Sequence, residues 1–327
     1  MTGAARPGFP ARGGAASGSL TTLARAAVGD LVALDATDGA SAAVTAVRAL
    51  LRRAPELAAA PAALGAADSD LLAALAELSE VAGWILFDAG LNRAAARMNL
   101  RALALAERSG DRATARLTLL NHSMLLTHQR RPVAALDAVA RVAGPRPLPN
   151  LVATLVLVRR AHASALLGCR RDAMAFMARA RSRFLDGASR LDPAWSWWID
   201  EPELTGHHGW VLATLHDRDR AIALLHEAAT APGPSYRDLF TAELLAALAR
   251  AGAWREAEDL IAALAPRAGG IGSVRTTRGL ARTATRLRGH EGAPGNARDA
   301  ADFLLRSLPP RRRCLPPRPE SGNGPAR

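Results

Sequence analysis

Apolar residues recur every three or four positions along most of the chain, with polar residues between them. Alanine and leucine dominate these segments and β-branched runs are scarce, a pattern typical of α-helices. We therefore predict an all-α protein. The pattern predicts helices near residues 20–35, 41–53, 69–88, 91–108, 111–128, 132–143, 149–167, 170–185, 202–215, 218–230, 236–251, 253–265, 275–287 and 297–307.

Small residues recur at matching places in five consecutive helix pairs. The second helix of each pair opens with an alanine, at Ala95, Ala135, Ala173, Ala221 and Ala257. The first helices hold a small residue near the middle in four pairs, at Gly83, Ser123, Ala161 and Gly209. Two helix axes approach within about 8 Å only where the side chains between them are small. The layout predicts a tetratricopeptide-like α-solenoid of antiparallel helix pairs over residues 69–266, with an ordinary alanine-rich bundle as the alternative.

Four further segments flank these repeats. Residues 1–19 have no helical period and residues 309–327 are rich in proline and arginine, so both are expected to be disordered. Residues 20–68 are expected to form a helical lead-in and residues 267–308 the C-terminal capping helices. The N-terminus has no apolar stretch typical of a secretory signal, and the longest apolar run, residues 151–158, is too short to span a bilayer. We expect a cytoplasmic protein without membrane contact.

The charge balance changes along the chain. All 42 basic residues are arginines, against 30 acidic residues, and the net charge is +12. The lack of lysine excludes Schiff-base chemistry and a P-loop. Residues 266–327 contain 13 arginines and 4 acidic residues, whereas the preceding part is nearly balanced. We expect weak attraction of DNA by the basic end and no sequence-specific DNA binding by this chain alone, with a merely solvated tail as the alternative.

No catalytic or metal-binding motif is evident. The adjacent pair His207 and His208 and the separated pair His122 and His128 lack the spacing of a zinc site. A G-x-S-x-G motif is missing, and the glycines of residues 269–272 lack the preceding strand of a dinucleotide-binding fold. We therefore expect a non-enzymatic protein with no catalytic residue, cofactor or metal.

An insertion at residues 189–204 interrupts the repeat spacing. It contains three of the six tryptophans, Trp195, Trp197 and Trp198, in a chain with only 4% aromatic residues. Such a cluster must either pack against neighbouring helices or bind a partner. We expect Trp197 or Trp198 to anchor the insertion, and Trp195 to be the more exposed ring beside a concave groove.

A helical solenoid presents a concave surface, lined by the first helix of each pair. The side chains expected there are Glu80, Trp84, Asn121, Met124, Arg159, His162, His207 and Trp210. An asparagine can bind a peptide backbone through both its donor and its acceptor, and tryptophan and methionine can hold apolar groups. We predict that Trp84, Asn121, Met124, His162, His207 and Trp210, with Trp195, form a binding site. The predicted ligand is a protein or peptide, and ordinary helix surface is the alternative for each residue.

Three segments resemble a known family. They are ELSEVAGWILFDAGLNRAAARMNLRALALAERSGDR at residues 77–113, DPAWSWWIDEPEL at 192–204 and AGAWREAEDLIAAL at 251–264. They are similar to the C-terminal, tetratricopeptide-like sensor half of actinobacterial Cro/C1-type (XRE) helix-turn-helix transcriptional regulators. The resemblance spans residues 20–287. It implies a regulatory module that binds a peptide or small-molecule effector. A homodimer is left open.

We expect no counterpart of that family's DNA-binding head in this chain. A helix-turn-helix needs a compact multi-helix unit before the first repeat, and only two helices precede residue 55. The leading interpretation is a regulatory interaction module that binds a partner or effector. The alternative is a DNA-binding regulator whose N-terminal helix-turn-helix is missing from this gene model, and an enzyme of unknown type is the third hypothesis. An in-frame helix-turn-helix sequence upstream of Met1 would separate the first two.

Overall fold

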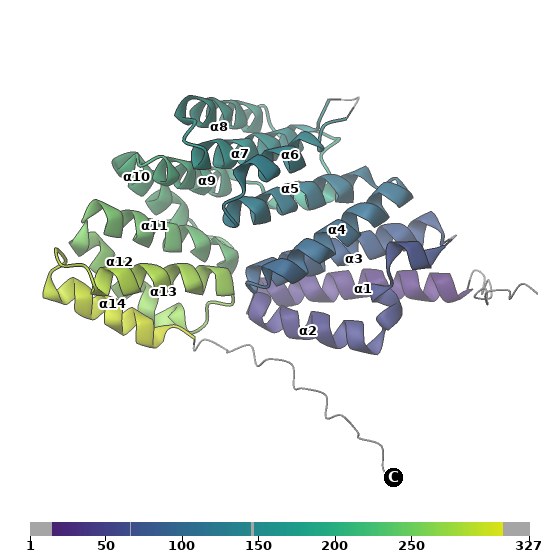
Figure 1. The fold of residues 1–327 in the computed structure, drawn as a ribbon, viewed down its shortest axis with the longest axis horizontal. Helices are drawn as coiled ribbons and strands as arrows, with labels where there is room; N and C mark the ends of the chain where they lie inside the picture. The colour runs from purple at the N-terminus through teal and green to yellow at the C-terminus, as the bar shows by residue number, and fades with distance from the viewer. Residues whose placement is uncertain (1–14, 66, 145–146, 310–327) are drawn as a thin grey trace, which may run out of the picture.

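The computed structural model describes residues 15–65, 67–144 and 147–309, and within these ranges the regular structure is helical throughout (Figure 1). The α-helices of this part of the chain are α1 (Ala15–Asp38), α2 (Ala40–Arg53), α3 (Ser69–Asp88), α4 (Asn92–Ser109), α5 (Arg112–His128), α6 (Pro132–Ala140), α7 (Asn150–Leu166), α8 (Arg170–Leu185), α9 (Glu201–Thr214), α10 (Arg218–Thr230), α11 (Asp238–Ala251), α12 (Trp254–Ala268), α13 (Val274–Arg288) and α14 (Gly295–Ser307). Short 3₁₀ turns are η1 (Pro55–Ala58), η2 (Pro61–Leu64), η3 (Ala194–Trp198) and η4 (Ser235–Arg237). The all-α prediction is confirmed.

Most helix ends lie within a few residues of their predicted positions. The first helix differs, because α1 begins at Ala15 and includes residues 15–19, which the sequence assigned to an irregular N-terminus. The disorder expected for residues 1–14 and 310–327 lies outside the described residues. Helix α5 begins with a side-chain cap: the Asp111 side chain accepts hydrogen bonds from the backbone N–H groups of Ala113 and Thr114 at 3.1 and 3.0 Å.

The predicted small residues lie at the helix crossings. Five of them are completely buried: Ala95, Ala135, Ala173, Ala221 and Ala257. A Cβ atom placed on Gly83 would collide with the side chain of Asn99, and one on Gly209 would lie 2.8 Å from Cγ of Leu225. Each helix from α3 to α12 packs against its partner in the predicted pair, so the placement of the small residues is confirmed.

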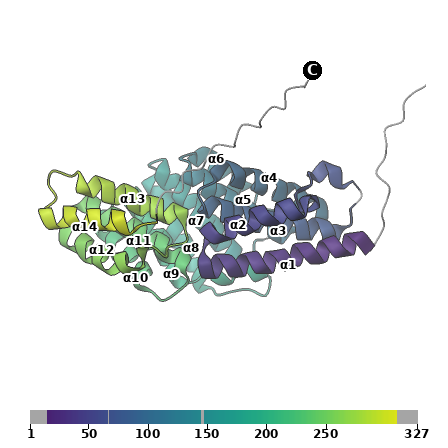
Figure 2. The same cartoon turned by 90° about the horizontal axis from the view of Figure 1, so that it is seen from below.

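The odd-numbered helices form a circle of contacts. Each helix from α3 through α5, α7, α9 and α11 contacts the next, and α13 returns to contact α3. Figure 1 shows the resulting arch, with α1 to α4 at one foot and α11 to α14 at the other, and Figure 2 shows both feet from below. We call the side on which the odd-numbered helices meet the inner side.

The two feet join at a set of contacts that we call the clasp, between residues 39–41 and 84–90 on one foot and residues 272–278 on the other. The backbone N–H and Oγ of Ser41 donate to the carbonyl of Gly272 at 3.0 and 2.9 Å. Gly39 approaches the same residue so closely that a Cβ atom on it would lie 2.5 Å from Gly272 Cα. Among the described residues, no apolar cluster contains both α13 and α3, so the contacts between these two helices are mainly polar. An apolar cluster also joins the feet, because Leu239 of α11 packs with Leu86 and Phe87 of α3.

None of the helices in residues 15–65, 67–144 and 147–309 has the length and apolar content required to cross a bilayer. The insertion at residues 189–204 lies against the start of α7, where Asp192 accepts a hydrogen bond of 2.9 Å from the backbone N–H of Leu151. The insertion is therefore held to the helical body by specific polar contacts.

Candidate functional site

Six of the predicted binding residues lie on α3, α5, α7 and α9. We call them the inner-face residues: Trp84, Asn121, Met124, His162, His207 and Trp210. Met124 belongs to one apolar cluster on which Trp84 and Trp210 also pack. His162 lies edge-on to both His207 and Trp210, with ring centroids 5.0 and 4.7 Å apart. The fold therefore brings together side chains from helices that are far apart in the sequence.

Most inner-face residues are buried instead of lining an open groove. Asn121 is 9% exposed, Met124 7%, His162 5% and His207 2%. Trp84 and Trp210 are half-buried. The physical reason is the closed circle of odd-numbered helices, which turns the expected concave surface into an interior.

Two histidines form the centre of a polar network. Nε2 of His162 and Nδ1 of His207 are 3.0 Å apart, so one ring donates a hydrogen bond to the other. Nε2 of His207 lies 3.3 Å from Oε1 of Glu203 and 3.5 Å from Nη1 of Arg159. Burial, and then the nearby charge of Arg159, hold the pKa of His207 well below its usual value. The histidines are therefore uncharged hydrogen-bonding groups near neutral pH.

The network continues to η4 through Glu203. Burial raises the pKa of Glu203 to about 7, against the opposing effects of Arg159 and Arg237. Oε2 of Glu203 lies 3.8 Å from Nε of Arg237, and the Arg237 guanidinium also contacts the Asp200 carboxylate. Within the described part of the chain, Glu203 Oε2, Arg237 Nε and the Tyr236 hydroxyl are buried without a hydrogen-bond partner. These atoms at the α9–η4 end of the inner side could therefore form hydrogen bonds with a ligand.

A second polar pair joins α3 to α5. Nδ2 of Asn121 donates a hydrogen bond of 2.6 Å to Oε1 of Glu80, and both side chains are buried. Burial raises the pKa of Glu80 to about 7, although the bond from Asn121 lowers it. The amide of Asn121 is thus already engaged within the protein.

The clasp adds a third polar group, which the sequence did not identify. Asp88 Oδ1 accepts hydrogen bonds from Nε of Arg275 at 3.1 Å and from Oγ of Ser273 at 2.9 Å. The Arg275 guanidinium lies over the rings of Phe87 and Trp84, at 4.6 and 5.6 Å from their centroids. The regular spacing of arginines in residues 275–287 could have indicated that one side of this helix makes polar contacts. Nothing in the sequence around Asp88 indicated that it pairs with Arg275.

The tryptophan insertion differs from the expectation. Trp197 is 73% exposed, whereas Trp195 and Trp198 are half-buried against the apolar core. Nε1 of Trp195 donates to the carbonyl of Ala113 at 3.2 Å. The expectation that Trp195 is the exposed ring is therefore wrong. In the 3₁₀ turn η3, residues three apart share one side, so Trp195 and Trp198 both face the core and Trp197 faces away.

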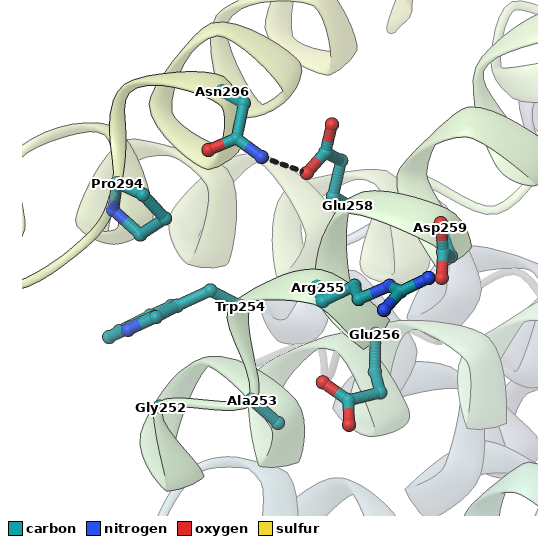
Figure 3. Close-up of a pocket in the computed structure, with 9 residues that line it drawn as sticks. All are labelled: Gly252, Ala253, Trp254, Arg255, Glu256, Glu258, Asp259, Pro294 and Asn296. Carbon is teal, nitrogen blue, oxygen red and sulfur yellow. Dashed lines mark hydrogen bonds between the residues drawn. The ribbon is translucent and has the colours of Figure 1, made fainter.

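A surface pocket of about 680 Å³ lies between α12 and α14, and its lining residues are drawn in Figure 3. Trp254, Glu256 and Asp259 line it from α12, and Asn296 donates a hydrogen bond of 2.5 Å to Glu258 across it. Of these acidic residues, Glu256 lies in the first turn of α12, where the helix dipole favours a negative charge. The pocket contains none of the inner-face residues, and we do not assign the candidate site to it.

No group of three or more His, Cys, Asp or Glu side chains within the described ranges is arranged to hold a metal ion. Searches against protein-family models and against curated proteins find no match. The inner side therefore provides three chemical features: apolar rings, uncharged histidines and buried charged groups with unused hydrogen-bonding atoms. Together these suit non-covalent recognition of a ligand that has both apolar and polar groups.

Proposed function

We propose that this protein is a non-enzymatic interaction module of tetratricopeptide-like architecture, related to the sensor halves of helix-turn-helix regulators. It acts in the cytoplasm without a cofactor and binds a peptide, a segment of a partner protein or a small effector on its inner side. The observation that supports this proposal is the convergence of the inner-face residues from four separate helices. Repeat proteins use such a shared surface for recognition.

Binding requires the arch to open. The inner-face residues are largely buried in the closed arrangement, so a ligand reaches them only when the feet separate. The clasp is the natural point of opening, because it consists mainly of hydrogen bonds and an ion pair. A ligand with higher affinity for the open form shifts the population towards that form. Ligand binding would thus be coupled to the opening of the arch, and an effector sensor requires such coupling.

A peptide-binding experiment tests the proposal. The full chain is applied to an immobilised array of random dodecapeptides, and bound peptides are compared among variants with conservative changes. Trp84→Phe and Trp210→Phe alter the inner face, whereas Trp197→Phe and Trp254→Phe alter tryptophans elsewhere. We expect the inner-face variants to lose about fivefold in affinity for the selected peptides, the equivalent of about 1 kcal/mol per aromatic contact.

The control variants should bind like the parent protein. Equal binding by all four variants would contradict the inner side as the recognition surface. Failure to select any peptide would contradict a peptide ligand.

A further inference from the structure

The arginine excess at the C-terminal end of the sequence is partly built into the folded body. Helix α13 contains Arg275, Arg278, Arg282 and Arg286 at spacings of three and four residues. This spacing places their side chains along one side of a helix. A continuous basic stripe therefore runs along α13, in addition to the basic tail.

The first part of this stripe faces the inner side. Arg275 lies over Phe87, and Nη1 of Arg278 donates to the carbonyl of Gly90 at 3.3 Å. His128, at the end of α5, packs edge-on to Phe87 with ring centroids 5.5 Å apart. Burial and then the charges of Arg275, Arg282 and Arg278 lower the pKa of His128 to about 4. His128 is therefore an uncharged hydrogen-bonding group surrounded by arginines.

The guanidinium of Arg275 has unused hydrogen-bonding capacity. Its side chain is only 4% exposed, and its Nε donates to Asp88. Its Nη1 is buried and has no hydrogen-bond partner within the described residues. A buried donor without a partner is destabilising, and a hydrogen bond to a ligand oxygen would remove that cost.

The acidic groups on this side do not cancel the positive charge. Asp88 is already engaged by Nε of Arg275 and by Ser273. Burial raises the pKa of Glu243 on α11, and raises that of Asp35 on α1 to about 6. Both carboxyl groups therefore keep their protons to higher pH than exposed carboxyls do. Arg130 and Arg250 add positive charge around Glu243.

We propose that Arg275, together with Arg278 and Arg282 on the same side of α13, forms a binding site for an oxyanion, either a carboxylate group of an acidic peptide or a phosphate group. Arginine is suited to both because its planar guanidinium donates paired hydrogen bonds to two oxygens. If the oxyanion is a peptide carboxylate, the proposal rests on the proposed function and specifies that the bound peptide is acidic. If the oxyanion is a phosphate group, the proposal does not depend on peptide binding.

Isothermal titration of the full chain with two probes tests the site. The probes are inorganic phosphate and an amidated hexaglutamate peptide, each at low and at physiological ionic strength. The variants are Arg282→Gln and the double change Arg278→Gln with Arg282→Gln, since both side chains are exposed. The matched control is Arg288→Gln on the same helix, whose guanidinium pairs with Asp302 at 3.1 Å on the outer surface.

We expect at least one probe to bind the parent protein. The single variant should lose about threefold in affinity and the double variant about tenfold, in line with the modest strength of ion pairs made by exposed side chains. The control should bind like the parent, and unchanged thermal melting of all variants shows that they are folded. Binding of phosphate alone identifies a phosphate site, and binding of hexaglutamate alone identifies a carboxylate site.

Arginine-dependent phosphate binding would support the oxyanion site even if the peptide array selects nothing. Equal losses in Arg288→Gln and Arg282→Gln would mean only general attraction by positive charge and would overturn the proposal. Lack of binding by both probes would overturn it as well.

Discussion

Asp88, the last residue of α3, accepts a 3.1 Å hydrogen bond from Nε of Arg275, in the first turn of α13. Both side chains are less than a tenth exposed. The pair thus joins two feet of the arch that are far apart in the sequence. Its burial has an energetic consequence, because removal of one partner leaves the other charge without compensation.

Asp88→Ala is expected to lower the free energy of unfolding by about 3–5 kcal/mol, because it leaves the buried Arg275 guanidinium unpaired. Urea unfolding followed by circular dichroism measures this. The control, Asp302→Ala, breaks pairs with Arg288 and Arg306 on the surface and should cost far less, because exposed ion pairs contribute little to stability. Similar losses in the two variants would show that the clasp pair is no stronger than a surface pair.

Gly39→Ala is expected to destabilise the protein by about 1–3 kcal/mol, because its Cβ would overlap the backbone of Gly272 and its φ of 74° disfavours a side chain. Gly29→Ala is the matched control, since nothing lies within 4 Å of a Cβ at that position within α1. The control should be neutral or stabilising by up to about 1 kcal/mol. Thermal melting of both variants provides the comparison. Equal melting temperatures would contradict the close approach of Gly39 to Gly272.

Ala173→Leu is expected to cost about 1–3 kcal/mol, because Ala173 is fully buried where α8 crosses α7. Ala178→Leu makes the same change at an exposed position of α8 and should have little effect. Chemical denaturation of the two variants tests this. An unchanged free energy of unfolding in Ala173→Leu would contradict the placement of Ala173 at the helix crossing.

Glu80→Gln is expected to change how stability depends on pH. Burial raises the pKa of Glu80 from 4.5 to about 7, so the folded protein binds this proton more tightly than the unfolded chain does. The contribution of Glu80 to stability therefore falls as the pH rises from about 4.5 to about 7. The unfolding free energy of the variant, relative to the parent, should rise over this interval by up to about 3 kcal/mol. A difference independent of pH, measured by urea unfolding at several pH values, would contradict the raised pKa.

Trp198→Ala is expected to cost about 2–3 kcal/mol, because its ring packs on the core beneath η3. Trp197→Ala should cost less than about 0.5 kcal/mol, since that ring is 73% exposed. Differential scanning calorimetry of the two variants measures both values. The reverse order would mean that the insertion packs through Trp197.

The sequence predicts the helices and their crossings well because both depend on local spacing. Ala95, Ala135, Ala173 and Ala221 recur with a turn before each, and all four are fully buried. The inner-face residues also follow from this register, since the first helix of each pair repeats the same orientation. Helical periodicity therefore locates side chains on a face, although it does not determine whether that face is open.

Closure of the arch could not be predicted in the same way. Asp88 and Arg275 each look like ordinary residues at a helix end, and no local pattern links them. The exposure of Trp197 was missed for a different reason, because the insertion forms a 3₁₀ turn with three residues per turn instead of an irregular loop. Both features depend on contacts or geometry outside the α-helical period.

Hydrogen–deuterium exchange of the full chain, with and without a saturating peptide selected from the array, tests the inner side as the recognition surface most directly. The account predicts altered exchange in the inner helices α3, α5, α7 and α9, and faster exchange in the clasp segment 272–278 as the arch opens. The outer helices α4, α6, α8 and α10 should exchange as they do without peptide. Changes confined to the outer helices or to the insertion at residues 189–204 would contradict it.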